Sequence, residues 1–273
     1  MTAPGSSIGA LPHALADGER LAERMGGRDP AVFLDYDGTL APIVDRPEDA
    51  LIAPSMRRAV RELARRCPVC VVSGRDRPVV QQLMGVDDLV VAGSHGFDIW
   101  SPDGGAVEHE AAAGYEDLVA AVTARAHAEL DSLPGVLVEP KRASVAVHFR
   151  LADDHTRPRV QEVVDGLLAG HPNQLKVTPG KMVLELQPKL DWDKGKAVLH
   201  LIAALGLDRD DVVPLYLGDD ITDEDAFAAL AGRGIGIFVG DLDDPEVAGR
   251  TTAADFILYS TEEVERFLTT LAR

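Results

Sequence analysis

The sequence predicts an α/β protein whose core is a parallel β-sheet, interrupted by an inserted αββαββ cap domain. Short apolar runs alternate with helical periodicity over 31–92 and again over 195–273, whereas the block between them reads as two helix–strand–strand units. Alternation of strands with helices indicates βαβ units, whose strands pair in parallel. We therefore expect a Rossmann-like core with its ligand chemistry at the carboxyl ends of the strands.

The individual elements follow from apolar runs and helical spacing. In the core, strands are expected at 31–34, 69–72, 89–92, 212–217 and 235–239, and helices at 55–66, 78–84, 195–205, 222–230 and from 261 onwards. In the cap, helices are expected at 115–130 and 157–168, and strands at 136–139, 144–150, 174–177 and 181–187. These ranges divide the chain into a core of 29–112 and 189–273, a cap of 113–188, and an N-terminal segment of 1–28. That segment has a possible helix at 11–25, but the sequence does not define its role.

The composition excludes several classes of partner. Lys and Arg total 27 against 45 Asp and Glu, which gives a formal net charge of -18. That charge repels nucleic acid and anionic membranes, so we expect neither as a partner. It also repels a phosphorylated small molecule, so a phosphate site here requires local cations or a bound metal. The start of the chain lacks a basic, apolar leader and no apolar run reaches membrane-spanning length, which predicts a cytoplasmic protein.

A pair of carboxylates follows the first apolar strand, in the segment Leu-Asp-Tyr-Asp-Gly-Thr at 34–39. Residues i and i+2 of an extended chain point the same way, so Asp35 and Asp37 can face one site at the strand end, and Thr39 continues along the same line. One carboxylate of such a pair can hold a hard cation and attack phosphorus while the other transfers protons. The alternative is an Asp-rich turn between strand and loop.

A second acidic cluster follows the strand at 213–217, in Gly-Asp-Asp-Ile-Thr-Asp-Glu-Asp at 218–225. Asp219 lies at the strand end, in the same class of position as Asp35. Glu224 and Asp225 are explained by a helix start, where acidic groups interact favourably with the helix dipole. So many carboxylates at two strand ends are unfavourable without a cation, which predicts Mg²⁺.

Two further segments offer groups that can hold a phosphoryl group. Ser73 ends the strand at 69–72 and could donate its hydroxyl and backbone N–H, although a plain Ser-Gly turn is the alternative. Lys194 opens the helix after the cap, where a positive charge could neutralise the nucleophile and the transferred group. Lys196 is its competitor, and spacing from the glycine does not decide between them.

Taken in order, these segments resemble the four motifs of the haloacid dehalogenase-like phosphohydrolases: Asp-x-Asp-Gly-Thr at 35–39, Val-Ser-Gly-Arg at 72–75, Lys-Gly at 194–195 and Gly-Asp-Asp-x-Thr-Asp at 218–223. Four further segments resemble the trehalose-6-phosphate phosphatase family: Gly-Ser-His-Gly-Phe at 93–97, Glu-Pro-Lys at 139–141, the strand at 144–150 and Gly-Lys-Met-Val-Leu-Glu at 180–185. The resemblance covers nearly the whole chain from about residue 30. It departs from the family pattern at Phe149, where Tyr is usual, and at Asp98, where Glu is frequent.

The resemblance implies a role for each matching residue. Asp35 is expected as the nucleophile, Asp37 as the general acid and base, and Ser73 and Lys194 as phosphate binders, with the lysine directly before the glycine favoured over Lys196. The expected Mg²⁺ ligands are Asp35, Asp37 through its carbonyl, and Asp219, supported by Asp220 and Asp223. Candidate substrate-binding residues in the core are Thr39, Arg75 and His95.

The cap strands supply an independent expectation about the substrate. Alternate residues of a strand face opposite sides, so each strand presents polar residues on one face and apolar residues on the other. The candidate sugar-binding residues on the polar face are Glu139, Lys141, His148, Arg150, Lys181 and Glu185. Such a mixture of charged and hydrogen-bonding groups suits the hydroxyls of a neutral disaccharide, although an ordinary solvated sheet face is the alternative.

The leading hypothesis is hydrolysis of trehalose 6-phosphate to trehalose and phosphate. Another phosphorylated sugar, such as a sucrose-type or glycosylglycerate phosphate, is an alternative, because the four core motifs say nothing about the leaving group. A sugar phosphotransferase or mutase, and a sugar-phosphate sensor without activity, are alternatives from other classes. The oligomeric state and any regulation are left open by the sequence.

Overall fold

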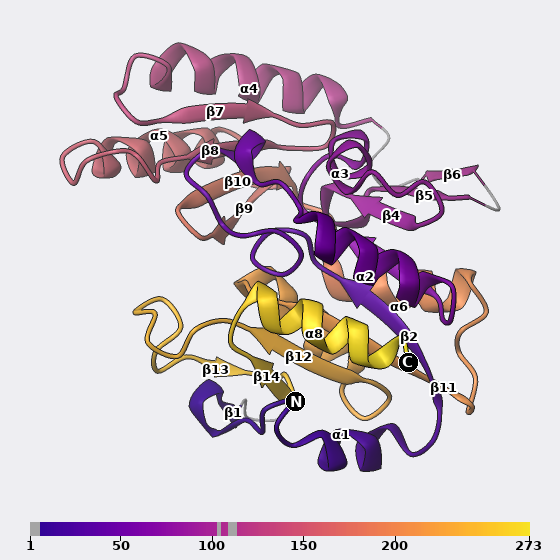
Figure 1. Cartoon of the computed structure of the whole chain (residues 1–273). Coiled ribbons are helices and arrows are strands. Elements are labelled where there is room, and N and C mark those ends of the chain that lie inside the picture. The colour runs from indigo at the N-terminus through magenta and orange to yellow at the C-terminus, as the bar shows by residue number, and fades with distance from the viewer. Residues whose placement is uncertain (1–5, 103–104, 109–113) are drawn as a thin grey trace. The chain divides into compact units, whose positions relative to one another are not determined.

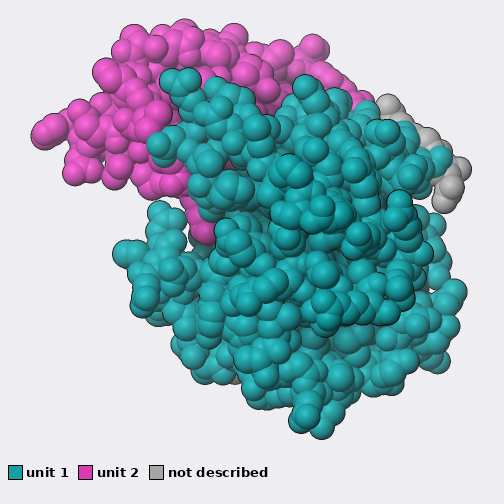
Figure 2. Space-filling model, in the orientation of Figure 1, with its two compact units in different colours: residues 1–107, 193–273 teal, residues 108–192 magenta. Residues whose placement is uncertain are grey.

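The computed structural model describes residues 6–102, 105–108 and 114–273. The chain divides into two compact units, which Figure 2 distinguishes by colour: unit 1 is Met1–Val107 with Asp193–Arg273, and unit 2 is Glu108–Trp192. Unit 2 is thus inserted between the two halves of unit 1, and each unit contains both helices and strands. The predicted α/β class, with a parallel-sheet core and an inserted cap, is confirmed.

The sheet of unit 1 has the strand order β14-β12-β11-β2-β3-β4-β5-β6. Every neighbouring pair from β14 to β4 is parallel, and β5 runs antiparallel to β4. The strands are β2 (Asp29–Leu34), β3 (Val69–Val72), β4 (Val90–Gly93), β5 (Asp98–Ser101), β6 (Gly105–Glu108), β11 (Val212–Gly218), β12 (Ile235–Val239) and β14 (Phe256–Leu258). The predicted core strands are all present. β5, β6 and β14 are additional to the predicted strands.

Helices pack on the faces of this sheet. α2 (Pro54–Ala64), α3 (Arg77–Met84) and α8 (Thr261–Leu271) share one apolar core with alternate strand residues such as Val32 and Leu34, and Figure 1 shows α2 beside α8. On β11, Tyr216 faces the other way from its neighbours in that core, and its ring contacts Phe227 of α7 (Glu224–Leu230). α7 packs in turn against α6 (Lys194–Ala204). No helix in the described part of the chain is both long and apolar enough to span a bilayer.

The N-terminal segment covers an edge of the sheet. The N–H of Ile257 in β14 donates to Pro12 O at 3.0 Å, and the N–H of Ala14 donates to Ile257 O at 2.9 Å. Nearby, β1 (Ser6–Ser7) pairs with β13 (Thr251–Thr252). These bonds satisfy backbone groups that an edge strand would otherwise expose. The predicted helix at 11–25 is therefore wrong in its first half, because α1 (Gly18–Met25) begins only after the residues that pair with β14.

Unit 2 has the predicted αββαββ order. Its elements are α4 (Glu116–Leu130), β7 (Leu137–Pro140), β8 (Val145–His148), α5 (Arg157–Gly170), β9 (Leu175–Gly180) and β10 (Val183–Pro188). The strands form an antiparallel sheet in the order β7-β8-β10-β9. Both helices share an apolar core with one face of this sheet, including Val138, Val145 and Leu186, so the polar residues of alternating parity lie on the opposite face.

Two predicted cap strands are longer than the observed ones. β10 begins at Val183, because Lys181 and Met182 form the tight turn of the β9–β10 hairpin, and Met182 has a left-handed backbone with φ of 61°. β8 ends at His148, and Arg150 lies in a turn from which its guanidinium donates to Lys181 O at 3.0 Å. Lys181 and Arg150 therefore lie at the end of the polar face rather than within its strands.

Candidate active site

The strand register gathers the core motif residues at one edge of the sheet. Leu34 of β2 lies opposite Leu217 of β11 on one side and Val71 of β3 on the other. Because the strands are parallel, the residues that follow them emerge together, and Asp35, Asp219 and Ser73 are those residues. The backbone N–H of Asp35 donates to Leu217 O at 2.9 Å, which fixes the two acidic strand ends against each other.

Two glycines allow the carboxylates to approach the backbone. Gly38 has a φ of +75°, and a Cβ at this position would lie 2.1 Å from Asp219 Oδ2. A Cβ at Gly218 would lie 2.3 Å from the carboxyl carbon of Asp223. Both distances are far below any real contact, so only glycine fits at these two positions while the carboxylates keep their places.

Asp35 is a buried acid, with 5% of its surface exposed. Burial raises the pKa of its carboxyl well above the ordinary value; the Lys194 ammonium opposes this shift, and the carboxylates of Asp223, Asp219 and Asp37 add to it. Lys194 Nζ lies 3.0 Å from Asp35 Oδ1. One lysine beside several carboxylates leaves an excess of negative charge, which a further cation would offset.

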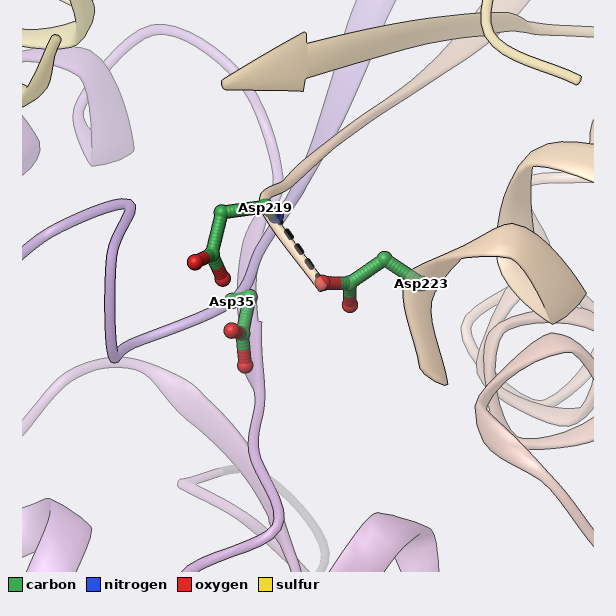
Figure 3. Close-up of side chains that lie close together, drawn as sticks. All are labelled: Asp35, Asp219 and Asp223. Atoms are coloured by element: carbon green, nitrogen blue, oxygen red, sulfur yellow. Dashed lines mark hydrogen bonds between the residues drawn. The ribbon is translucent and has the colours of Figure 1, made fainter. Parts of the chain in front are cut away.

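Asp223 is fully buried and accepts four hydrogen bonds. Its Oδ1 accepts from Lys194 Nζ at 2.7 Å and from the Tyr216 hydroxyl at 2.6 Å. Its Oδ2 accepts from the backbone N–H groups of Asp219 at 3.0 Å and Asp220 at 2.9 Å; Figure 3 shows the bond to Asp219. These four donors occupy the lone pairs of the carboxylate, so Asp223 is suited to orienting its neighbours rather than to holding an ion.

The aspartate cluster (Asp35, Asp219 and Asp223) has the composition of a hard-cation site. One carboxylate oxygen from each residue lies within 4.8 Å of the others. Carboxylate oxygens without nitrogen or sulfur ligands suit Mg²⁺, Ca²⁺ or Mn²⁺, so Asp35 and Asp219 fit such an ion as ligands, while Asp223 orients the backbone of Asp219 beside them. Asp220, which the sequence predicts as a supporting residue, instead accepts from Ile221 N–H at 2.7 Å and caps the short helix Ile221–Asp223.

Asp37 is held by Arg75 rather than by the aspartate cluster. Arg75 Nε donates to Asp37 Oδ2 and Arg75 Nη2 to Oδ1, both at 2.7 Å, and the guanidinium lies 5.6 Å from the centre of the Tyr36 ring. The Asp37 side chain is nevertheless 38% exposed. A bidentate ion pair keeps both carboxylate oxygens in one orientation at the surface of the site.

The loops after β3 and β4 interlock beside Ser73. His95 N–H donates to Ser73 O at 2.9 Å, and Ser94 N–H donates to Arg75 O at 2.7 Å. Ser94 and His95 both have positive φ, and a Cβ at Gly74 would lie 2.8 Å from the His95 ring. The Ser73 hydroxyl accepts from Arg75 N–H at 3.2 Å and is buried. The structure therefore places His95 against the Ser73–Arg75 loop, which it helps to hold in place.

Thr39, a candidate substrate-binding residue, is fully buried, and its hydroxyl has no hydrogen-bond partner among the described residues. Its contact with the substrate stays a prediction.

The start of α6 separates the two candidate lysines. Asp193 caps this helix, accepting from Lys196 N–H at 2.8 Å, and the Lys196 side chain is 38% exposed. The Lys194 side chain is only 3% exposed and points to Asp35. Burial disfavours its charge, but the Asp223 and Asp35 carboxylates outweigh that effect and raise the pKa of Lys194 well above its ordinary value. A Cβ at Gly195 would lie 2.3 Å from Asp225 O, so this glycine allows α6 to pack closely on α7.

The candidate cap residues form polar contacts with one another on one sheet face. His148 Nε2 lies 2.7 Å from Glu139 Oε2. Lys141 Nζ donates to Glu185 Oε2 at 3.1 Å. Ser144, which the sequence also places on this face, donates its hydroxyl to Glu185 Oε1 at 2.5 Å. Both glutamates lie opposite Ala146, so they occupy one row across the sheet.

Comparison with solved structures identifies the class to which this fold belongs. A haloacid dehalogenase-like hydrolase from Bacteroides thetaiotaomicron superposes with a TM-score of 0.63 at 16% identity, covering 89% of this chain and 100% of its own. The C-terminal domain of C. albicans trehalose-6-phosphate phosphatase superposes with a TM-score of 0.77 at 23% identity, covering 96% and 98%. The core and cap are therefore those of the haloacid dehalogenase-like fold.

Sequence comparison narrows the class to one family. The family model for trehalose-phosphatase matches residues 33–258. A trehalose-phosphate phosphatase of Mycobacterium tuberculosis is 44% identical over 265 residues, which are 96% of this chain and 66% of the relative. The chain belongs to the trehalose-phosphatase family, as the motifs predicted, and spans about two thirds of the length of that relative.

Proposed function

We propose that the chain is a Mg²⁺-dependent phosphatase that hydrolyses trehalose 6-phosphate to trehalose and phosphate. The observation that carries the proposal is the buried Asp35 carboxylate, which lies at a strand end with Lys194 Nζ at 3.0 Å. A nucleophile needs a cation beside it to accept an anionic phosphoryl group, and this pair provides one. The substrate, trehalose 6-phosphate, is inferred from membership of the trehalose-phosphatase family.

Asp35 and Asp37 have different roles in the proposed reaction: Asp35 attacks phosphorus and Asp37 transfers protons. A carboxylate oxygen of Asp35 attacks phosphorus, the phosphorus–oxygen ester bond breaks, and the departing sugar oxygen takes a proton from Asp37. Water then attacks the aspartyl phosphate and gives its proton to Asp37, and Asp35 leaves as a carboxylate. In this conformation both carboxylate oxygens of Asp37 accept hydrogen bonds from Arg75. At least one of these hydrogen bonds has to break before Asp37 can reach the leaving group.

The charge of the phosphoryl group is balanced by fixed groups. Lys194 faces Asp35 and remains positive, and Ser73 offers its backbone N–H or hydroxyl after rearrangement of its present bonds. Asp35 and Asp219, with the backbone carbonyl of Asp37, would hold Mg²⁺, which when bound neutralises the phosphoryl oxygens. Asp223 orients this arrangement through its bonds to Lys194 and to the backbone of Asp219.

The polar face of unit 2 is the proposed source of sugar specificity. Its glutamates are already held by Lys141, Ser144 and His148, so they present oriented acceptors for sugar hydroxyls. Arg150 and Lys181, joined by a hydrogen bond at the end of this face, extend it.

A phosphate-release panel tests the proposal. The purified chain is assayed with Mg²⁺ on trehalose 6-phosphate, sucrose 6-phosphate, glucosylglycerate-type phosphate, glucose 6-phosphate and an aryl phosphate. We expect the highest kcat/KM on trehalose 6-phosphate, and loss of activity with a chelator that returns with Mg²⁺. A higher kcat/KM on another phosphorylated sugar would replace the substrate. Phosphate transfer to a sugar without release would indicate a phosphotransferase, and binding without turnover a sensor.

A further inference from the structure

We propose that Tyr216 is a positioning residue of the phosphoryl-transfer site, acting on Lys194 and on the Asp219 segment through Asp223. The inference rests on the proposed function and adds to it a residue outside the four motifs. Tyr216 lies in the apolar strand β11, where its aromatic ring reads in the sequence as core. Its side chain is fully buried, but its hydroxyl donates to Asp223 Oδ1 at 2.6 Å.

The ring of Tyr216 is fixed by its neighbours. It meets the ring of Phe227 edge to face, with centroids 5.7 Å apart and planes at 78°. Phe227 lies over Gly236, the partner of Tyr216 in β12, where an added Cβ would lie 2.8 Å from the Phe227 ring. Because these contacts fix the ring, its hydroxyl points towards Asp223.

The hydrogen bond of Tyr216 matters because Asp223 Oδ1 serves two donors. The hydroxyl shares this oxygen with Lys194 Nζ, which also lies 3.0 Å from Asp35 Oδ1. While the hydroxyl is present, Asp223 is fixed from both sides and Lys194 stands between two carboxylates. Without the hydroxyl, Oδ1 keeps its hydrogen bond from Lys194 but loses the one that fixes it from the other side. The carboxylate can then turn and draw the ammonium away from Asp35.

The same loss affects the other oxygen of Asp223. Oδ2 accepts from the N–H groups of Asp219 and Asp220, and this pair of bonds sets the backbone that carries the Asp219 carboxylate. Rotation of the Asp223 carboxylate would lengthen these bonds. Tyr216→Phe is therefore expected to weaken both phosphate binding and cation binding, although the hydroxyl touches neither ligand.

The chain offers a control in Thr252 of β13, which lies outside the candidate active site. Its side chain is also buried, and its hydroxyl accepts one hydrogen bond, from Ala254 N–H at 3.0 Å. Thr252→Val and Tyr216→Phe thus each remove one hydroxyl from a buried position. If Tyr216 were core alone, both variants would lower the melting temperature and do nothing else.

The experiment compares these two variants with the wild type. Kd values for inorganic phosphate in the presence of Mg²⁺, and for Mg²⁺ alone, are measured by calorimetry; kcat/KM is measured on trehalose 6-phosphate and on an aryl phosphate. We expect Tyr216→Phe to lower kcat/KM about tenfold or more, by the same factor on both substrates, since a hydrogen bond to a charged group is removed. Its Kd for phosphate should rise, whereas Thr252→Val should change kcat/KM by less than about twofold.

A double-mutant cycle separates action through Asp223 from a general disturbance. Tyr216→Phe should have little further effect on kcat/KM or phosphate Kd in an Asp223→Asn background, because the Asp223 carboxylate through which Tyr216 acts is already absent. Additive effects, or unchanged Kd and kcat/KM in the single variant at a lowered melting temperature, would overturn the inference. If the wild type released no phosphate from trehalose 6-phosphate, the proposed function would fail alone. The phosphate and Mg²⁺ Kd values would still decide the role of Tyr216.

Discussion

The core edge and the polar face of the cap both gather charged side chains, but they hold them in different ways. In the core, Lys194 and Asp223 are almost completely buried, and Gly38 and Gly218 leave no space for any larger residue. In the cap, the Glu139 and His148 side chains are 32% and 25% exposed, whereas those of Lys141 and Glu185 are 8% and 9% exposed. The core cluster is thus buried, whereas part of the polar face of the cap is open. We therefore expect the reaction to be sensitive to small changes in the core, and the choice of sugar to changes on the cap face.

The largest difference is expected between the two lysines of α6. Lys194→Ala removes the buried ammonium beside Asp35 and should lower kcat by about a thousandfold or more, because the charge of the phosphoryl group is then unbalanced. Lys196→Ala is the matched control, and its partly exposed side chain should change kcat by less than about twofold. Steady-state kinetics on an aryl phosphate measure both. Equal losses would show that the start of the helix, rather than the buried charge, matters.

A second test concerns the close approach of Asp219 to Gly38. Gly38→Ala introduces a Cβ into the Asp219 carboxylate and should lower Mg²⁺ affinity and kcat by about a hundredfold. Gly206→Ala is its control, because Gly206 also has a positive φ, of +65°, but nothing lies within 4 Å of its Cβ. It should lower stability by about 1 kcal/mol from backbone strain alone. Unfolding curves and Mg²⁺ titration distinguish the two, and similar Mg²⁺ affinities in both variants would contradict the steric account.

The smallest effect is expected in the cap, and it should depend on the substrate. Glu185→Gln keeps the size of the side chain but removes the charge that Lys141 and Ser144 hold in place. We expect kcat/KM to fall about tenfold or more on trehalose 6-phosphate and less than about twofold on an aryl phosphate. Equal losses on the two substrates would mean that the polar face of the cap supports the fold and does not select the sugar.

The sequence was sufficient for the parts of the molecule that depend on local pattern. The strand-end positions of Asp35 and Asp219 follow from apolar runs that stop at carboxylates, and the αββαββ order follows from residue spacing. The features that only the structure reveals are contacts between residues far apart in the sequence. A tyrosine in an apolar strand looks like core until Tyr216 is seen to reach Asp223, and β14 is recognised only by its pairing with β12.

Contacts between residues far apart in the chain also explain the remaining differences between the sequence predictions and the structure. Spacing alone left Lys194 and Lys196 open, and the family resemblance favoured Lys194; the burial of Lys194 beside Asp35 adds a physical reason that spacing could not supply. The first half of the predicted helix at 11–25 instead pairs with an edge strand, a contact between residues far apart in the chain. Arg75 looked like a substrate ligand, but its partner in this conformation is Asp37.

The central claim is that Asp35 is the nucleophile, and Asp35→Asn tests it most directly. The variant keeps the shape of the side chain, so we expect an unchanged fold by circular dichroism and no phosphate release from trehalose 6-phosphate in the presence of Mg²⁺. Rapid-quench experiments should likewise detect a phosphorylated protein only when Asp35 is present. Phosphate release by Asp35→Asn at the wild-type rate would contradict the account.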